Sequence, residues 1–324
     1  MRRSSILIVT PYGALSNSGN WRTAARWARL LRDRFAVIVQ VQPEAQALAQ
    51  ALAQADCLIA LHARRSHPQI LAWRARRPAR PLIVALTGTD LYKDLPGDPQ
   101  ARESLRWADR VVVLQEDALA HMPRGVARKA RVVYQSAARL APASKPGSRL
   151  NAAMVAHLRL EKDPRTALLA WRHLPVDLPI GLRLIGAPLD PVLARFVEGE
   201  ARAEQRVRWL GPLPHAASRQ AIKRAHVLVV PSLMEGGANV IVEAVTAGTP
   251  VLASRVSGNI GMLGRDYAGY FPAGDAAALA GLLRRCWKDA GFLRTLTRQC
   301  RARAALFSPA REKASLTRLL RELL

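Results

Sequence analysis

Short apolar runs alternate with amphipathic segments through the first half of the chain. Such runs, bounded by polar or glycine-containing turns, are typical of strands covered on both faces of a parallel sheet. They predict strands at Ile6–Thr10, Ala36–Val41, Cys57–Leu61, Leu82–Leu86, Arg110–Leu114 and Arg131–Tyr134. The segments between them predict helices at 21–34, 44–54, 67–77, 100–107 and 116–121. Strands that alternate with helices indicate a doubly wound parallel sheet.

A second α/β rhythm follows a stretch without periodicity. Residues 136–150 are rich in Ala, Ser, Pro and Gly, as a linker is. Beyond it the pattern predicts strands near 151–157, 180–185, 207–210, 226–230, 250–253 and 269–271, and helices at 165–174, 275–289, 290–305 and 309–323. We therefore predict an α/β protein with two Rossmann-like domains, 1–140 and 151–305, a linker at 141–150 and a C-terminal helix within 306–324.

The segment from Ser232 to Val251 joins the end of a buried strand to a glycine turn and then to a helix. Glycines at 236 and 237 allow the backbone to turn tightly and to approach a ligand closely. Asn239 has a side chain suited to cap a helix that ends near Gly248. The amides at the start of this helix suit a bound anion.

Two glutamates lie within the same segment. Glu235 falls in the glycine turn, and Glu243 falls one turn into the predicted helix, between Val242 and Ala244. Because a carboxylate accepts two hydrogen bonds, one glutamate can hold a transferred hexose and the other a ribose. Two solvated surface glutamates are the alternative, but the apolar neighbours of Glu243 disfavour it. The segment therefore predicts a nucleotide-sugar site.

A basic pair follows the predicted strand at 151–157. Arg159 and Lys162 would emerge at its carboxyl end, where open α/β sheets bind ligands. A departing nucleoside diphosphate develops negative charge, which a metal ion or fixed cations must stabilise. The sequence contains no Asp-x-Asp pair, no His-Glu-x-x-His and no paired-cysteine zinc spacing. We therefore expect no metal and no cofactor, with the two cations and the helix dipole in their place.

These motifs carry a resemblance. Glu235-x7-Glu243, the following Ala-x-Thr-Ala-Gly-Thr-Pro-Val, and Arg159-x-x-Lys162 together resemble the C-terminal domain of the GT-B glycosyltransferases, in particular the retaining enzymes of family 4. The resemblance covers about residues 150–275. It implies a UDP-sugar-dependent transferase whose two domains face each other across a cleft, and whose last helix, within 306–324, packs back on the first domain.

The resemblance also implies roles for individual residues. Arg159, Lys162 and Glu235 would be catalytic, with the cations on the diphosphate and Glu235 on the donor sugar, while Glu243 would bind the ribose. The full donor set would be Arg159, Lys162, Leu213, Glu235, Gly236, Gly237, Ala238, Asn239, Val240 and Glu243. Gly237 replaces the aromatic residue usual in the family, so the contact with the hexose would differ. Retention of configuration is implied, although attack from the opposite face would give inversion with the same donor site.

Polar residues also follow three predicted strands of the first domain. Asn17 to Asn20 lie in the first loop, His62 and Arg64 follow the strand Cys57–Leu61, and Thr87 and Asp90 follow Leu82–Leu86. Carboxyl ends of parallel strands share one edge of the sheet. The candidates for an acceptor pocket are therefore Asn20, His62, Arg64, Thr87 and Asp90. A hydrogen-bonded core histidine and a helix-capping aspartate are the structural alternatives for His62 and Asp90.

A narrower resemblance lies in the same domain. The segments 17–28, 60–66 and 86–92 are similar to those of a small bacterial subgroup that includes the selenosugar synthases of selenoneine biosynthesis. This resemblance implies selenophosphate as the acceptor and a 1-seleno sugar as the product. Selenophosphate is a small anion that already carries a strong nucleophile, so it needs little general-base help and suits an arginine-lined pocket.

The net charge of +25 is compatible with several partners. Arginines at 22, 26, 29, 32 and 34 create a field that attracts nucleic acid, anionic lipid or phosphorylated substrates alike. We expect no nucleic-acid partner, because no base-stacking pattern of aromatic residues is present. A membrane-surface transferase acting on a lipid or polysaccharide precursor and a non-catalytic binding module remain alternatives. The oligomeric state is left open.

The chain shows no sign of membrane insertion or secretion. No apolar run reaches the roughly 18 residues of a membrane span, and the apolar core after Met1 is too short for a signal peptide. Cys57, Cys286 and Cys300 are scattered and odd in number, which is typical of a reducing compartment. We therefore expect a cytoplasmic protein.

Overall fold

The computed structural model describes residues 3–13, 19–42 and 45–324. The chain divides into two compact units, and the last helix belongs to the first of them. Unit 1 comprises Met1–Gln135 and Pro309–Leu324, and unit 2 comprises Ser136–Ser308. The segment predicted as a linker, 141–150, therefore lies inside unit 2. Asn17, one of the polar residues of the first loop, lies outside the described residues.

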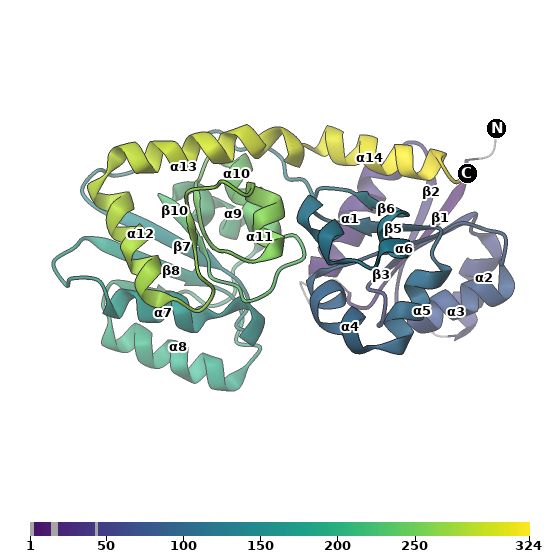
Figure 1. Cartoon of the computed structure of the whole chain (residues 1–324), viewed down its shortest axis with the longest axis horizontal. Coiled ribbons are helices and arrows are strands. Elements are labelled where there is room, and N and C mark those ends of the chain that lie inside the picture. Colours follow the sequence, from purple (N-terminus) through teal and green to yellow (C-terminus); the bar gives the residue numbers. More distant parts are fainter. Residues whose placement is uncertain (1–2, 14–18, 43–44) are drawn as a thin grey trace. The chain divides into compact units, whose positions relative to one another are not determined.

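Unit 1 contains a six-stranded parallel sheet in the order β2-β1-β3-β4-β5-β6 (Figure 1). Its strands are β1 (Ser5–Thr10), β2 (Ala36–Val41), β3 (Cys57–Leu61), β4 (Leu82–Ala85), β5 (Arg110–Val113) and β6 (Ala130–Val132). Ile6 is aligned with Val37 on one side and with Cys57 on the other. The chain order reverses direction beside β1, which is the point where doubly wound sheets bind ligands.

Both faces of this sheet are buried, which explains why its central strands are apolar throughout. Leu7 and Val9 pack into a core that includes Trp73 of α3, whereas Ile6 and Ile8 pack into a core with α1 and α14 on the opposite face. The helices of unit 1 are α1 (Gly19–Leu31), α2 (Ala45–Gln54), α3 (His67–Arg76), α4 (Leu95–Gly97), α5 (Pro99–Trp107), α6 (Arg124–Ala127) and α14 (Pro309–Arg321).

A buried carboxylate attaches α14 to α1. The side chain of Glu312 has no exposed surface and lies 2.9 and 3.0 Å from Nε of Arg26 through its two oxygens. The indole Nε1 of Trp27, which is itself fully buried, donates to Oε1 of Glu312 at 2.8 Å. One glutamate therefore accepts hydrogen bonds from two side chains of α1.

Unit 2 contains a second six-stranded parallel sheet, in the order β12-β11-β10-β7-β8-β9. Its strands are β7 (Leu150–Val155), β8 (Ile180–Ile185), β9 (Val207–Trp209), β10 (Val227–Val230), β11 (Val251–Ser254) and β12 (Tyr270–Phe271). Its helices are α7 (Pro164–Arg172), α8 (Pro191–Ala203), α9 (His215–Arg224), α10 (Asn239–Thr246), α11 (Ser257–Leu263), α12 (Ala276–Lys288) and α13 (Ala290–Arg303). The prediction of two Rossmann-like α/β domains, each with a parallel sheet, is confirmed.

The strands predicted from the apolar runs are all present, and most of their ends lie within one or two residues of the prediction. The helix expected at 116–121 is a 3₁₀ segment instead. Asp90–Asp94 forms a π-helical segment that continues into the single turn of α4. The apolar pattern did not predict the π-helical segment or α4, because irregular turns lack a fixed hydrophobic period.

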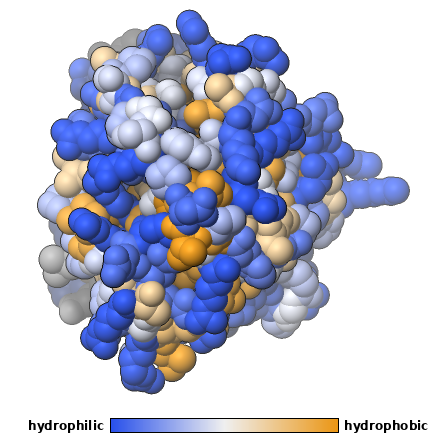
Figure 2. Space-filling view, turned by 90° about the vertical axis from the view of Figure 1, so that its left-hand side faces the viewer, coloured by the Kyte–Doolittle hydropathy of each residue, from blue (hydrophilic) through white to orange (hydrophobic). Residues whose placement is uncertain are grey.

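The surface of unit 2 is predominantly polar in the view of Figure 2. Hydrophilic side chains cover most of this face, and the apolar side chains gather in small groups between them (Figure 2). Among the described residues, none of the helices combines the length and the apolar character needed to cross a bilayer.

The three cysteines are free and buried. Burial raises the pKa of the Cys286 thiol to about 12 and that of Cys300 to about 11, and it raises the pKa of Cys57 beyond the usual range. A thiol reacts as its thiolate, so these side chains behave as small apolar core residues rather than as nucleophiles.

Substitution of Glu312 tests the attachment of α14. We expect Glu312→Ala to lower the free energy of unfolding by about 3–5 kcal/mol, because it leaves Arg26 and Trp27 buried without their acceptor. Urea unfolding followed by circular dichroism measures the change. The control is Glu322→Ala, which removes a half-exposed partner of Arg110 and Arg131 and should cost less than about 1 kcal/mol. Equal losses in the two variants would contradict the assignment.

Candidate functional site

Two of the predicted donor residues, Lys162 and Glu235, meet beyond the carboxyl ends of β7 and β10, which are neighbouring strands of unit 2. Lys162 ends a 3₁₀ turn after β7, and Glu235 lies in the loop after β10. Their side chains meet, with Nζ of Lys162 2.6 Å from Oε1 of Glu235. The backbone also joins the two loops, because the amide of Leu233 donates to the carbonyl of Glu161 at 2.9 Å. The structure thus brings together two residues that the sequence placed in separate motifs.

A left-handed residue sets the position of Lys162. Asp163 has φ 45° and caps α7 with its side chain, which accepts from the amide of Thr166 at 3.2 Å. The chain therefore leaves the 3₁₀ turn and enters α7 within a single residue. Because Lys162 directly precedes this cap, its direction is determined by the start of the helix.

A chain of hydrogen bonds holds Glu235 from behind. Its side chain is buried, and Oε1 also accepts from Oγ of Ser232 at 2.7 Å. Ser254, at the end of β11, donates through Oγ to the carbonyl of Ser232 at 2.5 Å, and Asn259 donates through Nδ2 to Ser254. Both hydrogen bonds to Glu235 reach Oε1, so Oε2 forms none with a described residue. Ser232 was not among the predicted site residues.

Glu243 is buried on α10 and contacts a residue that the sequence reasoning missed. Its Oε1 lies 2.7 Å from Nε2 of His215, the first residue of α9. The imidazole is half exposed, whereas the carboxylate is 7% exposed. Leu213 lies in the same loop, between β9 and α9, where its carbonyl accepts from Ser218. A histidine directly after Pro214, near the end of a strand, was the available signal for this partner.

One expectation for the donor loop is corrected. Asn239 is the first helical residue of α10, and Ala238 is the capping residue without a side-chain hydrogen bond, because the extended backbone ends at Ala238, with ψ 109°. Gly236 and Gly237 form the turn without a positive φ, and their close approach to a ligand stays a prediction. The expected C-terminal glycine of the helix is confirmed, since Gly248 has φ 74°.

Arg159 lies apart from the Lys162–Glu235 pair. Its guanidinium is 43% exposed and lies 3.8 Å from the carboxylate of Glu161, which is also partly exposed. Such a pair contributes little to stability, and the arginine can move without loss of a buried contact. Of the two predicted cations, the structure therefore places only Lys162 against a predicted carboxylate.

The acceptor candidates of unit 1 form a second cluster after β3 and β4. Nδ1 of His62 lies 2.5 Å from Oδ1 of Asp90, and both side chains are buried. Asp90 accepts through Oδ2 from the amide and the hydroxyl of Thr87, at 2.9 and 3.1 Å. Thr89 contacts Nε2 of His62 at 3.3 Å. His62 also has φ 78°, a conformation that side chains other than glycine rarely adopt, so its position is constrained on every side.

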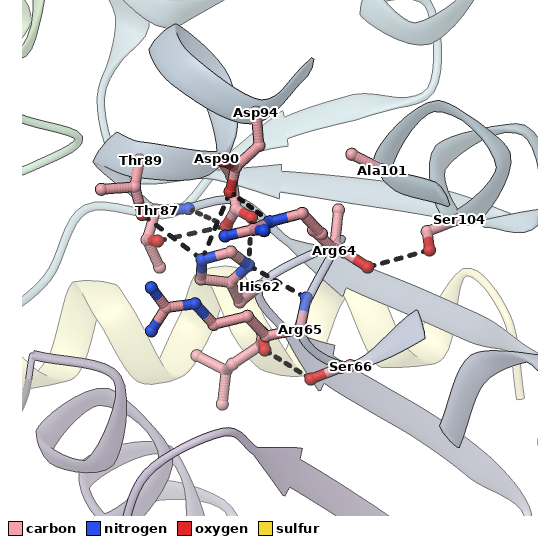
Figure 3. Close-up of polar contacts among 12 residues, drawn as sticks. His62, Arg64, Arg65, Ser66, Thr87, Thr89, Asp90, Asp94, Ala101 and Ser104 are labelled. Carbon is pink, nitrogen blue, oxygen red and sulfur yellow. Dashed lines mark hydrogen bonds and ion pairs between the residues drawn. The ribbon is translucent and has the colours of Figure 1, made fainter. Parts of the chain in front are cut away.

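Asp94 lies between His62 and Arg64 and joins the arginine to this cluster. Nε of Arg64 lies 3.2 Å from Oδ2 of Asp94, which in turn is 3.7 Å from Nε2 of His62. Figure 3 shows Arg64, Asp90 and Asp94 gathered around the imidazole, whereas the guanidinium of Arg65 points away from them. Asp94 was not predicted, because only the π-helical segment brings it one turn above Asp90.

The loop that carries His62 and Arg64 is supported from the core. Ser66 donates to the carbonyl of Leu61 at 2.7 Å, and buried Ser104 of α5 donates to the carbonyl of Ala63 at 2.9 Å. Asn20, the remaining acceptor candidate, is buried on α1. No hydrogen bond or ion pair among the described residues joins it to His62, so the structure does not bring it into the cluster.

His62, Asp90 and Asp94 are also the residues that can offer ligands to a metal ion. One atom of each lies within 4.8 Å of the others, and among the described residues they are the group of this kind. However, Asp90 already contacts the imidazole, and Asp94 already faces the Arg64 guanidinium. A cation would have to displace these contacts, so the arrangement is better suited to fixing the histidine and the arginine.

The comparison with protein families defines the class. Residues 140–305 match the family model described as glycosyl transferases group 1, which covers half of the chain. The chain belongs to this family. The match includes Lys162, His215, Glu235 and Glu243, whereas the cluster around His62 lies outside it.

Individual relatives cover parts of the chain. A D-inositol 3-phosphate glycosyltransferase of Geodermatophilus obscurus is 29% identical over 289 residues, or 84% of this chain and 58% of that protein. The enzyme of the same name from Corynebacterium glutamicum is 34% identical over 143 residues, or 40% of this chain and 34% of that protein. The chain thus spans between a third and three fifths of the length of these relatives.

Solved structures share the fold over the whole chain. Anabaena HepE in complex with UDP and glucose has a TM-score of 0.80 at 16% identity, with 99% of this chain and 100% of that chain covered. Sucrose-phosphate synthase of Thermosynechococcus elongatus has a TM-score of 0.79 at 20% identity, with 99% of each chain covered. At these identities the likeness establishes the fold.

A glycine at the start of α11 allows the loop of Glu235 to approach. A Cβ atom at Gly258 would lie 1.9 Å from the carbonyl oxygen of Glu235. We expect Gly258→Ala to displace this loop and to lower the free energy of unfolding by about 1–3 kcal/mol. The control, Gly281→Ala in α12, meets no atom within 4 Å and should stabilise the protein by about 0.5–1 kcal/mol. Urea unfolding compares them, and a neutral Gly258→Ala would show that the loop is not tightly held.

Proposed function

We propose that this protein is a glycosyltransferase that transfers a hexose or N-acetylhexosamine from a UDP-sugar to a small anionic acceptor. The observation that carries the proposal is the pairing of Lys162 with Glu235, in the loops that follow two neighbouring strands of a doubly wound sheet, together with the pairing of His215 with the second glutamate, Glu243. Membership of the group 1 family supports the assignment.

The donor would be held by these two pairs. Oε2 of Glu235 would accept from a sugar hydroxyl, since Oε1 is occupied by Lys162 and Ser232. Glu243 would accept from a ribose hydroxyl, with His215 fixing its other contact. The diphosphate would lie against Lys162 and the start of α10, where amides and the helix dipole favour an anion. The name of the HepE complex, with UDP and glucose, is compatible with such a ligand.

Lys162 and Arg159 would stabilise the negative charge that develops on the departing diphosphate. As the anomeric C–O bond breaks, negative charge moves to the UDP oxygens, and Lys162 is the basic side chain already fixed beside the expected sugar position. Arg159, exposed and weakly paired, can turn toward the second phosphate. We propose that these cations act without a metal ion. The family resemblance implies retention at the anomeric carbon.

Selenophosphate is the acceptor that we propose. In the cluster of unit 1, Arg64 pairs with Asp94, which also lies near His62. Arg65 follows Arg64 directly, and its guanidinium lies 4.9 Å from the centre of the Tyr12 ring. Two arginines on one loop suit a small dianion, and a selenide nucleophile requires little help from a base. The two relatives named for inositol 3-phosphate support a small phosphorylated acceptor in general. The selenium would displace UDP at the anomeric carbon, and cleavage of the P–Se bond by water would then release inorganic phosphate and the 1-seleno sugar.

An acceptor at a membrane surface is the second candidate. Arg29, Arg32 and Arg34 are exposed at the end of α1 and beyond it, where a lipid-linked or polysaccharide precursor could be approached. A galactosyltransferase of the lipopolysaccharide outer core, WaaB, shares the fold with a TM-score of 0.70 at 14% identity. For either candidate we propose a cytoplasmic location, since all three cysteines are free.

Calorimetry with UDP tests the donor site. We expect Lys162→Ala to weaken UDP binding about 10- to 100-fold, because a charged hydrogen bond to phosphate is lost, and Glu243→Ala about 10-fold. Glu235→Ala should weaken UDP binding less than Lys162→Ala does, because the lysine remains but loses the partner that positions it, and it should chiefly lose turnover, since the contact of Glu235 is with the sugar. The control is Glu198→Ala on the exposed face of α8. Native UDP affinity in Lys162→Ala would refute the donor site.

Mass spectrometry tests the acceptor. Incubation with UDP-glucose or UDP-N-acetylglucosamine and selenophosphate should yield UDP and a selenium-containing sugar. His62→Asn is the appropriate variant, because asparagine tolerates the positive φ at this position, and it should lower turnover at least tenfold. Arg64→Ala should chiefly raise the KM for selenophosphate. Unchanged kinetics in both variants would remove this cluster from the acceptor site, and transfer to a lipid acceptor alone would favour the second candidate.

A further inference from the structure

A basic depression lies on unit 1 along α14, and no residue of the two clusters described above lines it. It has a volume of about 660 Å³ and is lined by Arg34, Lys313, Arg318 and Arg321, together with Thr317 and Glu322. Arg34 lies two residues before β2, so the depression lies toward the amino ends of the strands. The His62 cluster follows β3, at the carboxyl ends of the strands.

The charges of the depression are not balanced within it. Lys313 pairs with Asp33 at 2.7 Å, and Glu322 is shared between Arg110 and Arg131 at 3.4 and 3.3 Å. Arg34, Arg318 and Arg321 form no salt bridge with any described residue. All three are exposed. Three guanidinium groups therefore line the depression, and its one acidic side chain, Glu322, already pairs with Arg110 and Arg131.

A buried hydroxyl in the lining has no hydrogen-bond partner. Thr317 is 7% exposed, and its Oγ1 is buried without a donor or acceptor among the described residues. A threonine within a helix ordinarily donates to the carbonyl one turn earlier, so this hydroxyl departs from the usual arrangement. An unsatisfied buried hydroxyl destabilises the free protein, and a ligand oxygen that accepted its proton would remove this cost.

We infer that this depression binds a phosphate-bearing ligand. A phosphate group offers several acceptor oxygens and a double negative charge, which match three arginines and one hydroxyl donor. The volume falls in the range of pockets that hold small organic phosphates. The inference is independent of the proposed donor site and of the cluster around His62, because none of their residues lines the depression; it shares Arg34 with the second acceptor candidate.

Pyrophosphate is a suitable probe, provided that its binding at the donor site is separated. Isothermal titration of the full chain, first saturated with UDP, should show saturable pyrophosphate binding. The double variant Arg318→Glu/Arg321→Glu should raise the Kd at least tenfold, whereas Lys162→Ala should leave it within twofold. The control is Arg195→Glu/Arg202→Glu on the exposed face of α8, which changes the net charge equally and should leave the Kd within threefold.

Thr317→Val separates a binding role from a structural one. The substitution keeps the shape of the side chain and removes the orphan hydroxyl, so the ligand-free variant should unfold at a higher urea concentration than the native protein. Its Kd for pyrophosphate should nevertheless rise about three- to tenfold, because one hydrogen bond to the ligand is lost. A variant that is destabilised, or that binds pyrophosphate with native affinity, contradicts the role given to this hydroxyl.

Vesicle sedimentation distinguishes the source of the phosphate. If the natural ligand is a lipid headgroup, the native chain should sediment with phosphatidylglycerol vesicles but not with phosphatidylcholine vesicles, and Arg318→Glu/Arg321→Glu should abolish this. If it is a free phosphate ester, pyrophosphate should bind while neither vesicle does. Absence of both effects overturns the proposal, as does an equal loss in the Arg195→Glu/Arg202→Glu control. Loss of UDP binding alone would bear on the proposed function and not on this depression.

Discussion

The contact between Lys162 and Glu235 is the interaction on which the donor site depends. It joins the loops after two neighbouring strands, and it places a cation and a carboxylate at the edge where a doubly wound sheet exposes its strand ends. The carboxylate is buried, so its charge must be paired, and the lysine provides that partner while part of it stays accessible to solvent. A single ion pair thus holds the loop in place and positions a positive charge for a phosphate.

The two units use the same device with different residues. In unit 2, Ser232, Ser254 and Asn259 form a hydrogen-bonded support behind Glu235. In unit 1, Asp90 and Thr87 support His62 in a strained backbone conformation. In both cases a buried side chain at the end of a strand is held by polar partners, which reduces the entropy lost when a ligand binds.

The fold could be predicted from sequence because each central strand is apolar on both faces, and such runs have few other interpretations. The donor glutamates and Lys162 could be predicted because their motifs are local. The partners were harder to predict. His215 meets Glu243 only through the packing of α9 beside α10, and Asp94 reaches His62 only through a π-helical segment that has no hydrophobic signature. Asn239 was misplaced by one residue, since a capping preference does not specify where the extended backbone ends.

The attachment of α14 has a consequence for biosynthesis. Unit 1 is discontinuous in the chain: Trp27 finds its acceptor in Glu312, which is 285 residues later. During translation, the face of the first sheet that α1 covers therefore lacks α14 until nearly the whole polypeptide has emerged from the ribosome. All residues of unit 2 precede α14 in the chain, so unit 2 can complete its core before unit 1 does.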